Sequence, residues 1–130
     1  MNKTLLEQFA QKAEQKAQSR LELKTFSLAG IDTPFKQLSH NEKLEYFEML
    51  VEAGSNVAKN NNICKQMIYD CCPSLQDDEL VKTLGCVDPY DVVLKLLDIA
   101  EIDELGLKLL KWQGIMKDNA SVDTAELEKN

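Results

Sequence analysis

The chain has 130 residues and a net charge of −7, with 44% apolar and 28% charged residues. That length suits one domain with a buried core, and that composition is typical of a folded protein and excludes wholesale disorder. The charge is uneven, because residues 1–24 carry five Lys or Arg against three Asp or Glu, whereas residues 70–104 carry ten acids against two lysines. An acidic middle repels phosphate, so we expect no binding to nucleic acid.

The sequence also bears on the compartment. It has no apolar run near the roughly 20 residues that span a bilayer, and its amphipathic first residues do not resemble a secretory signal. Four cysteines in a chain without an export signal indicate reduced thiols. We therefore expect a cytoplasmic protein that makes no use of a membrane.

Residues 4–18 are predicted to form a helix, because apolar side chains recur there at helical spacing. The stripe consists of Leu5, Leu6, Phe9, Ala13 and Ala17. It fades from leucine and phenylalanine to alanine, so we expect residues 1–19 to form a helix that docks loosely or frays.

Residues 21–35 are predicted to form a small β-hairpin. The alternation of apolar residues changes parity between Thr25 and Phe26, which indicates either a bulge or a strand boundary. Residues 29–32 supply the turn, since Gly30 accepts a positive φ. A hairpin alone is marginally stable, so it must lie on the helices or pair elsewhere.

Short helices are predicted after the hairpin. Ser39 and Glu42 form a capping box that opens a helix ending near Ala53. Four of its apolar residues are expected to face the core, namely Leu44, Phe47, Leu50 and Val51. Residues 55–62 read as a loop by composition. The next helix is predicted over residues 63–72, with its apolar side made of Ile63, Met67, Ile68 and Cys71.

The second half continues this pattern. Acidic residues 77–79 suit the start of a short helix that ends at Gly85. Asp88 is the expected N-cap of another helix, with Pro89 at its first position. That helix is nearly all apolar and is expected to be central to the core through Val92, Val93, Leu96, Leu97 and Ile99. The last helix is predicted over residues 101–113.

These elements define an α+β fold that is predominantly helical, with a small N-terminal β-hairpin packed on a bundle of short helices. We expect residues 1–114 to form a single globular domain and residues 115–130 to form a flexible acidic C-terminal tail.

No group of residues resembles a reaction centre or a metal site. The cysteines Cys64, Cys71, Cys72 and Cys86 lack the paired spacing of structural zinc ligands and are predicted to fill the core. His40 has no nucleophile suggested by sequence order. The carboxylates near Asp98 do not follow the spacing of a calcium-binding loop. We therefore predict no catalytic residues, no cofactor and no metal.

The last helix carries the one stripe with a functional alternative. Ile102, Leu105, Leu109, Trp112 and Met116 recur at intervals of three and four residues. Packing against the chain's own core is the preferred interpretation, since two heptads are too few to indicate a coiled coil. At the outer end of the stripe, Leu109, Trp112 and Met116 are the residues that we predict to bind a partner, because Trp and Met are favoured at interfaces.

The order of these segments resembles the small tail assembly chaperones of long-tailed bacteriophages, including those of Gram-positive prophages. The resemblance rests on residues 21–50 (LELKTFSLAGIDTPFKQLSHNEKLEYFEML), on residues 88–114 (DPYDVVLKLLDIAEIDELGLKLLKWQG) and on the polar tail that follows. It is a likeness of layout over most of the chain from about residue 20.

The resemblance implies a non-enzymatic protein of the host bacterial cytoplasm that is not retained in the mature virion. Such a protein binds the tape measure protein and helps to recruit tail tube subunits. It implies no catalytic residues, and we expect a monomer or a weak homo-oligomer. In many of these phages a programmed frameshift appends a second domain near the end of the gene.

Two other classes of protein stay open. One is a cytoplasmic acidic helical adaptor or regulator unrelated to tails, including an inhibitor that mimics the charge of DNA. The other is an enzyme, which would require a polar cleft around His40 or around clustered carboxylates.

Overall fold

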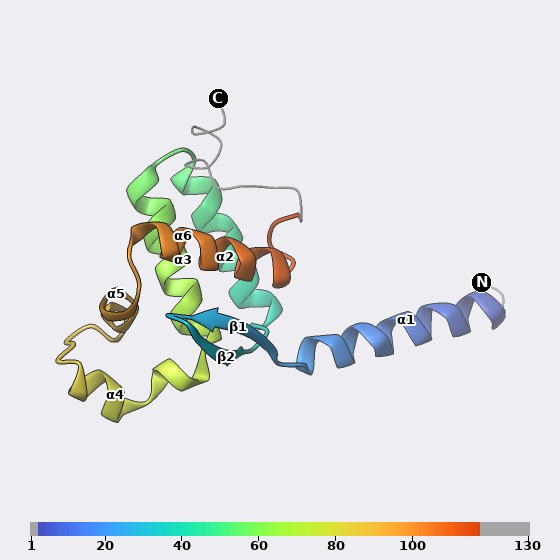
Figure 1. Cartoon of the computed structure of the whole chain (residues 1–130). Coiled ribbons are helices and arrows are strands. Elements are labelled where there is room, and N and C mark those ends of the chain that lie inside the picture. The colour runs from blue at the N-terminus through green and yellow to red at the C-terminus, as the bar shows by residue number, and fades with distance from the viewer. Residues whose placement is uncertain (1–2, 118–130) are drawn as a thin grey trace.

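The computed structural model describes residues 3–117 and has the predicted α+β, mainly helical fold (Figure 1). The elements run in the order α1 (Lys3–Leu21), β1 (Lys24–Leu28), β2 (Ile31–Phe35), α2 (His40–Ala53), α3 (Val57–Cys71), the 3₁₀ turn η1 (Pro73–Gln76), α4 (Asp78–Thr83), the 3₁₀ turn η2 (Pro89–Asp91), α5 (Val92–Leu96) and α6 (Ile99–Trp112). None of the helices in this described range is long and apolar enough to cross a membrane.

The hairpin is short and regular. Strands β1 and β2 pair antiparallel from Lys24 with Phe35 to Leu28 with Ile31, without a bulge. The change of parity in the sequence therefore marks a boundary, since the strand begins only at Lys24. Ala29 and Gly30 form the turn, both with positive φ (53° and 79°), as two-residue hairpin turns of this kind require.

The core forms where α6 lies across α3 (Figure 1). Gly106 of α6 meets Cys64 of α3, and a β-carbon at position 106 would lie only 2.3 Å from the Cys64 β-carbon. The largest fully buried side chains around this crossing are Phe35, Met67, Ile68, Ile102, Leu109, Leu110, Val92 and Val93. The hairpin thus contributes to the same core as the helices, which settles where it packs.

Gln113 connects three segments below this crossing. Its side chain accepts a hydrogen bond from the Leu38 backbone N–H (2.9 Å) and donates to the Lys36 carbonyl (2.9 Å) and to the Cys71 Sγ (3.2 Å). The Lys36 N–H in turn donates to the Cys71 carbonyl (2.8 Å). The segment of chain that follows β2 is therefore hydrogen-bonded to the ends of both α3 and α6.

Helix α3 begins earlier than the sequence predicts, so the loop prediction for residues 55–62 is wrong. Asn56 caps the helix by accepting the Lys59 N–H (2.9 Å). The buried Asn60 donates to the Gly54 carbonyl, and Asn61 donates to the Asp103 carboxylate of α6. These partners override the low helix propensity of asparagine.

The helix predicted through residue 99 is interrupted. Helix α5 ends at Leu96, Leu97 is extended, and Asp98 caps α6 in a box with Glu101. Ile99 opens α6 and is 70% exposed, so its predicted place in the core is wrong. Val92 and Val93 are fully buried, as expected.

Helix α2 has the predicted capping box of Ser39 and Glu42, but it packs on a different face. Tyr46 and Ala53 of α2 are buried in the core, and Leu50 is half-buried against it. Three of the four residues predicted to point inward lie outside instead, with Leu44 47%, Phe47 51% and Val51 65% exposed. The helix is apolar on two faces, and the prediction selected the wrong one.

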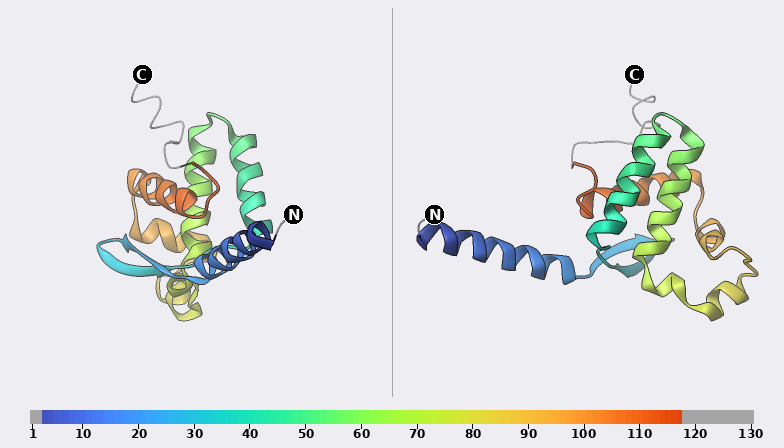
Figure 2. Two further views of the ribbon diagram at one scale, coloured as in Figure 1. Left: turned by 90° about the vertical axis from the view of Figure 1, so that its right-hand side faces the viewer. Right: turned by 180° about the vertical axis from the view of Figure 1, so that it is seen from behind.

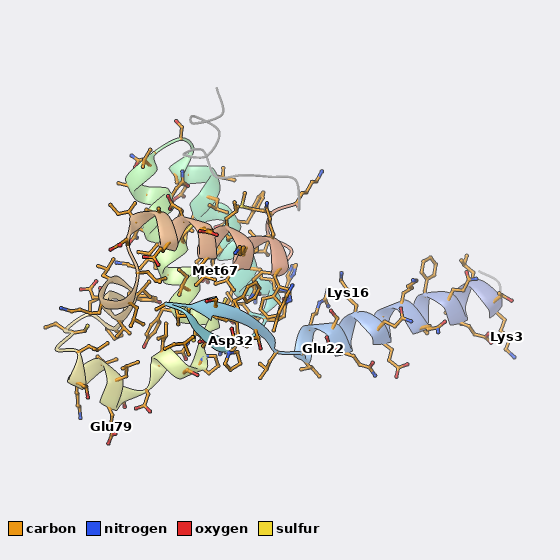
Figure 3. The ribbon with its side chains drawn as sticks, in the orientation of Figure 1. Lys3, Lys16, Glu22, Asp32, Met67 and Glu79 are labelled. Carbon is orange, nitrogen blue, oxygen red and sulfur yellow. The ribbon has the colours of Figure 1, made fainter. Side chains whose placement is uncertain are left out.

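Helix α1 extends away from the rest of the protein (Figures 1 and 2), and none of its residues is buried. It is longer than predicted by one residue at the start and three at the end. Figure 3 shows the labelled Lys3 at the far end of the helix, away from the body, whereas Lys16 lies nearer the end that joins the body and lines a cavity there. At the other end, the Ile115 and Met116 N–H groups bond to the Leu110 carbonyl, and the remainder of the predicted tail lies outside the described residues.

Candidate partner-binding surface

The outer face of α2 is the candidate functional surface. We call Leu44, Phe47 and Val51 the α2 stripe, because their spacing of three and four residues places them on one side of the helix. All three are exposed although each is large and apolar. Single exposed apolar residues are ordinary. A row of three on one helix face instead marks a place that the surface of a partner can cover.

The stripe ends beside an open hollow of about 330 Å³ between α2 and the turn after α6. Leu44 and Phe47 line it from α2, and Gly114 and Ile115 line it from the turn. Gly114 has φ +78°, which lets the chain turn so that Ile115 returns towards Leu110. The hollow extends the stripe across two elements that are distant in sequence.

Acidic side chains follow the stripe along α2. Each stripe residue is succeeded by an exposed glutamate, namely Glu45, Glu48 and Glu52, which we call the α2 acids. The surface is therefore an apolar row with acidic side chains along one edge and Lys43 at the other. Such a row fits an amphipathic helix whose apolar side is flanked by cations.

Only part of the predicted partner-binding site lies at the surface. Leu109 is completely buried in the core, so a partner cannot touch it in this fold. Trp112 is half-buried and packs edge-on to Phe26, with 5.7 Å between ring centroids, and Met116 is also half-buried. With Lys24, Phe26, Lys108 and Lys111, Trp112 lines a separate shallow hollow of about 530 Å³.

A polar cluster joins α2, α3 and η2. The hydroxyls of Tyr46 and Tyr90 both donate to the Asp70 carboxylate, that of Tyr90 over 3.0 Å. Burial, followed by the hydrogen bond to Asp70, raises the pKa of Tyr90 to about 12 and raises the pKa of Tyr46 well above its usual value. Both hydroxyls therefore stay protonated at neutral pH and serve as donors that connect the helices.

The cysteines and the other polar candidates have structural surroundings. Burial raises the pKa of Cys64 and of Cys71 to about 12, so neither is a thiolate at neutral pH. His40 is exposed in the first turn of α2 and borders a hollow of about 420 Å³ whose other charged lining residues are the cations Lys16, Arg20 and Lys43. Asp98 caps α6. Among residues 3–117, no three His, Cys, Asp or Glu side chains are placed to hold a metal ion.

The sequence of α2 carries a signal for this surface. Helix α2 has apolar residues on both sides, so the spacing of its residues is compatible with either side facing the core. The side that carries Tyr46 is the buried one, and the tyrosine hydroxyl can be buried because Asp70 accepts its hydrogen bond. Comparisons with protein-family models, with curated proteins and with solved structures gave no match.

Proposed function

We propose that the chain is a non-enzymatic tail assembly chaperone that binds an amphipathic helix of the tape measure protein on the outer face of α2. The observation that carries the proposal is the α2 stripe, a row of three large apolar side chains that are 47–65% exposed and bordered by the α2 acids. The chain would bind the tape measure protein in the host bacterial cytoplasm, before the virion is complete.

The physics of the partner supports this assignment. A long helical tape measure protein exposes apolar faces until the tail tube covers them. A chaperone for such a protein needs an accessible apolar strip to shield those faces and a strong net charge to keep the complex in solution. The α2 stripe supplies the first requirement, and the net charge of −7 supplies the second. Recruitment of tail tube subunits belongs to the same proposal and rests on the resemblance alone.

Co-expression with the tape measure protein of the same phage or prophage tests the proposal. We expect the chain to increase the recovery of soluble tape measure protein and to co-purify with it. Phe47→Glu places a charge in the stripe and should abolish both effects. Val87→Glu is the matched control, because Val87 is a fully exposed apolar residue that lies outside the stripe.

Two results would contradict the proposal. Equal loss of binding in both variants would mean that the α2 stripe is not the contact surface. A folded chain that leaves the tape measure protein insoluble would remove the chaperone role and favour the alternative of an adaptor or regulator unrelated to tails.

A further inference from the structure

Helix α1 carries a pattern that complements the outer face of α2. Apolar residues follow one side of α1 at intervals of three and four, namely Leu6, Phe9, Ala13 and Ala17, which we call the arm stripe. Leu6 is 58% and Phe9 is 56% exposed. Leu6, Phe9 and Ala13 have the same spacing as Leu44, Phe47 and Val51, so the two stripes present rows of equal length.

The arm stripe and the α2 stripe each have a basic edge and an acidic edge, so the basic edge of one can face the acidic edge of the other. Glu7 and Glu14 form the acidic edge of the arm stripe, and Lys43 precedes Leu44 on α2. Lys12, Lys16 and Arg20 follow one another at intervals of four along the edge of the arm stripe, and we call them the arm cations. Within the described part of the chain, none of them takes part in an ion pair. The α2 acids lie along the opposite edge of their own stripe and, within the described residues, are likewise without an ion pair.

The helices of one chain are not placed to bring these rows together. Only Glu22 and Leu23 separate α1 from β1, and neither is a glycine or a proline that would favour a reversal. The last turns of α1 instead bring Lys16 and Arg20 to a cavity of about 420 Å³ that Lys43 also lines, so like charges meet there. Burial and then these two cations lower the pKa of Lys43.

We propose that a second copy of this chain supplies the occupant of the α2 stripe, with α1 of each copy lying on α2 of the other. A two-fold dimer makes this contact twice, so a modest helix-to-helix interface is doubled. Lys12 and Lys16 each precede a residue of the arm stripe, whereas each α2 acid follows a residue of the α2 stripe. On right-handed helices placed face to face, the charged rows meet when the two helices run parallel.

The dimer uses the surface that the proposed function assigns to the tape measure helix, and its regulatory consequence rests on that function. Helix α1 of the second copy covers the α2 stripe until a helix of the tape measure protein displaces it. Self-association and partner binding then exclude each other, and the free chaperone does not expose the stripe.

Sedimentation velocity of the full chain over a range of concentrations tests the dimer. We expect a reversible monomer–dimer equilibrium that weakens as salt is raised, because exposed ion pairs are screened. Phe9→Glu and Phe47→Glu should each raise the dissociation constant by at least about tenfold. Gln15→Glu adds the same charge on the opposite side of α1 and should leave the equilibrium unchanged.

Charge exchange provides the decisive arm of the experiment. A variant with Lys12→Glu and Lys16→Glu and a variant with Glu45→Lys and Glu48→Lys should each be monomeric alone. Mixed together, they should form a heterodimer, because α1 of each variant then faces an α2 of opposite charge in the other variant. Carbodiimide cross-linking of a mixture of ¹⁴N-labelled and ¹⁵N-labelled wild-type chains should join α1 lysines to α2 glutamates in mixed-isotope pairs.

Three outcomes would overturn the dimer. These are a monomer at every concentration, cross-links between α1 and α2 within one chain only, and a dimer that persists in Phe9→Glu. The proposed function fails separately, through a tape measure protein that is not bound. If both proposals hold, Phe9→Glu should bind that protein more tightly than the wild type, whereas Phe47→Glu should not bind it.

Discussion

Gly106 of α6 and Cys64 of α3 are in such close contact that a β-carbon on the glycine would lie 2.3 Å from that of the cysteine. Helices α3 and α6 cross at this point, so the distance between them depends on the missing side chain. Because Gly106 has an ordinary helical φ, its role here is to give space rather than to allow an unusual backbone angle.

Gly106→Ala is therefore expected to destabilise the fold. The added methyl group should cost about 1–3 kcal/mol through overpacking, partly offset by the better helix propensity of alanine, about 1 kcal/mol. Urea unfolding measures the change. The double variant with Cys64→Gly should lose less free energy of unfolding than the two single variants lose in total, because the second change removes the obstructing β-carbon. An unchanged midpoint in Gly106→Ala would contradict this close contact.

Gln113 should be required for stability because it satisfies backbone groups on the segment after β2. Gln113→Leu leaves the buried Leu38 N–H without its acceptor, which should lower the free energy of unfolding by about 1–3 kcal/mol. Gln113→Glu retains an acceptor but loses the donor to Lys36. Gln37→Ala is the control, since it removes two hydrogen bonds, one to the Trp112 carbonyl and one from Lys43, at a more exposed position and should cost less. Equal unfolding midpoints for all three variants would contradict this role.

Local signals in the sequence predicted the fold better than they predicted the surface. Capping residues such as Ser39 and Asp88 act within one helical turn, so the first turns that they open follow from neighbouring residues alone. The orientation of α2 depends on Asp70, 24 residues after Tyr46, which supplies the acceptor that lets the tyrosine hydroxyl be buried. A contact of that kind is not visible in a local pattern.

The same limitation explains the start of α3. Asn60 and Asn61 indicate a loop by composition, yet each has a hydrogen-bond partner that only the folded chain supplies. The hairpin could be predicted from the sequence, because its turn needs residues that tolerate positive φ and Gly30 is such a residue.

Alkaline pH should destabilise the protein. The pKa of Tyr90 is about 12 in the folded state and about 10 when the chain is unfolded, so between these values the unfolded chain loses its proton first. The unfolded state then binds fewer protons, and the free energy of unfolding falls as the pH rises above about 10. Urea midpoints measured from pH 8 to pH 12 should show this fall, and Tyr90→Phe should reduce its slope. A slope unchanged by that substitution would contradict the assigned cause.

The four thiols should differ in reactivity. Cys64, Cys71 and Cys72 are buried, and burial raises the pKa of each, whereas Cys86 is half-buried. A chromogenic thiol reagent at neutral pH should therefore modify one cysteine per folded chain and all four after denaturation. Cys86→Ser should eliminate the fast reaction without changing the total released by denaturant by more than one thiol. Rapid modification of the Cys86→Ser variant would mean that the core opens easily.

Truncation of the residues around the end of α6 and on α2 should separate core from surface. Leu109→Ala removes a fully buried side chain and should cost about 2–5 kcal/mol. Phe47→Ala removes an exposed one and should change the free energy of unfolding by no more than about 0.5 kcal/mol. Trp112→Ala should fall between them, because the indole is half-buried against Phe26. If Phe47→Ala instead cost as much as Leu109→Ala, the α2 stripe would belong to the core and both proposals that use it would fail.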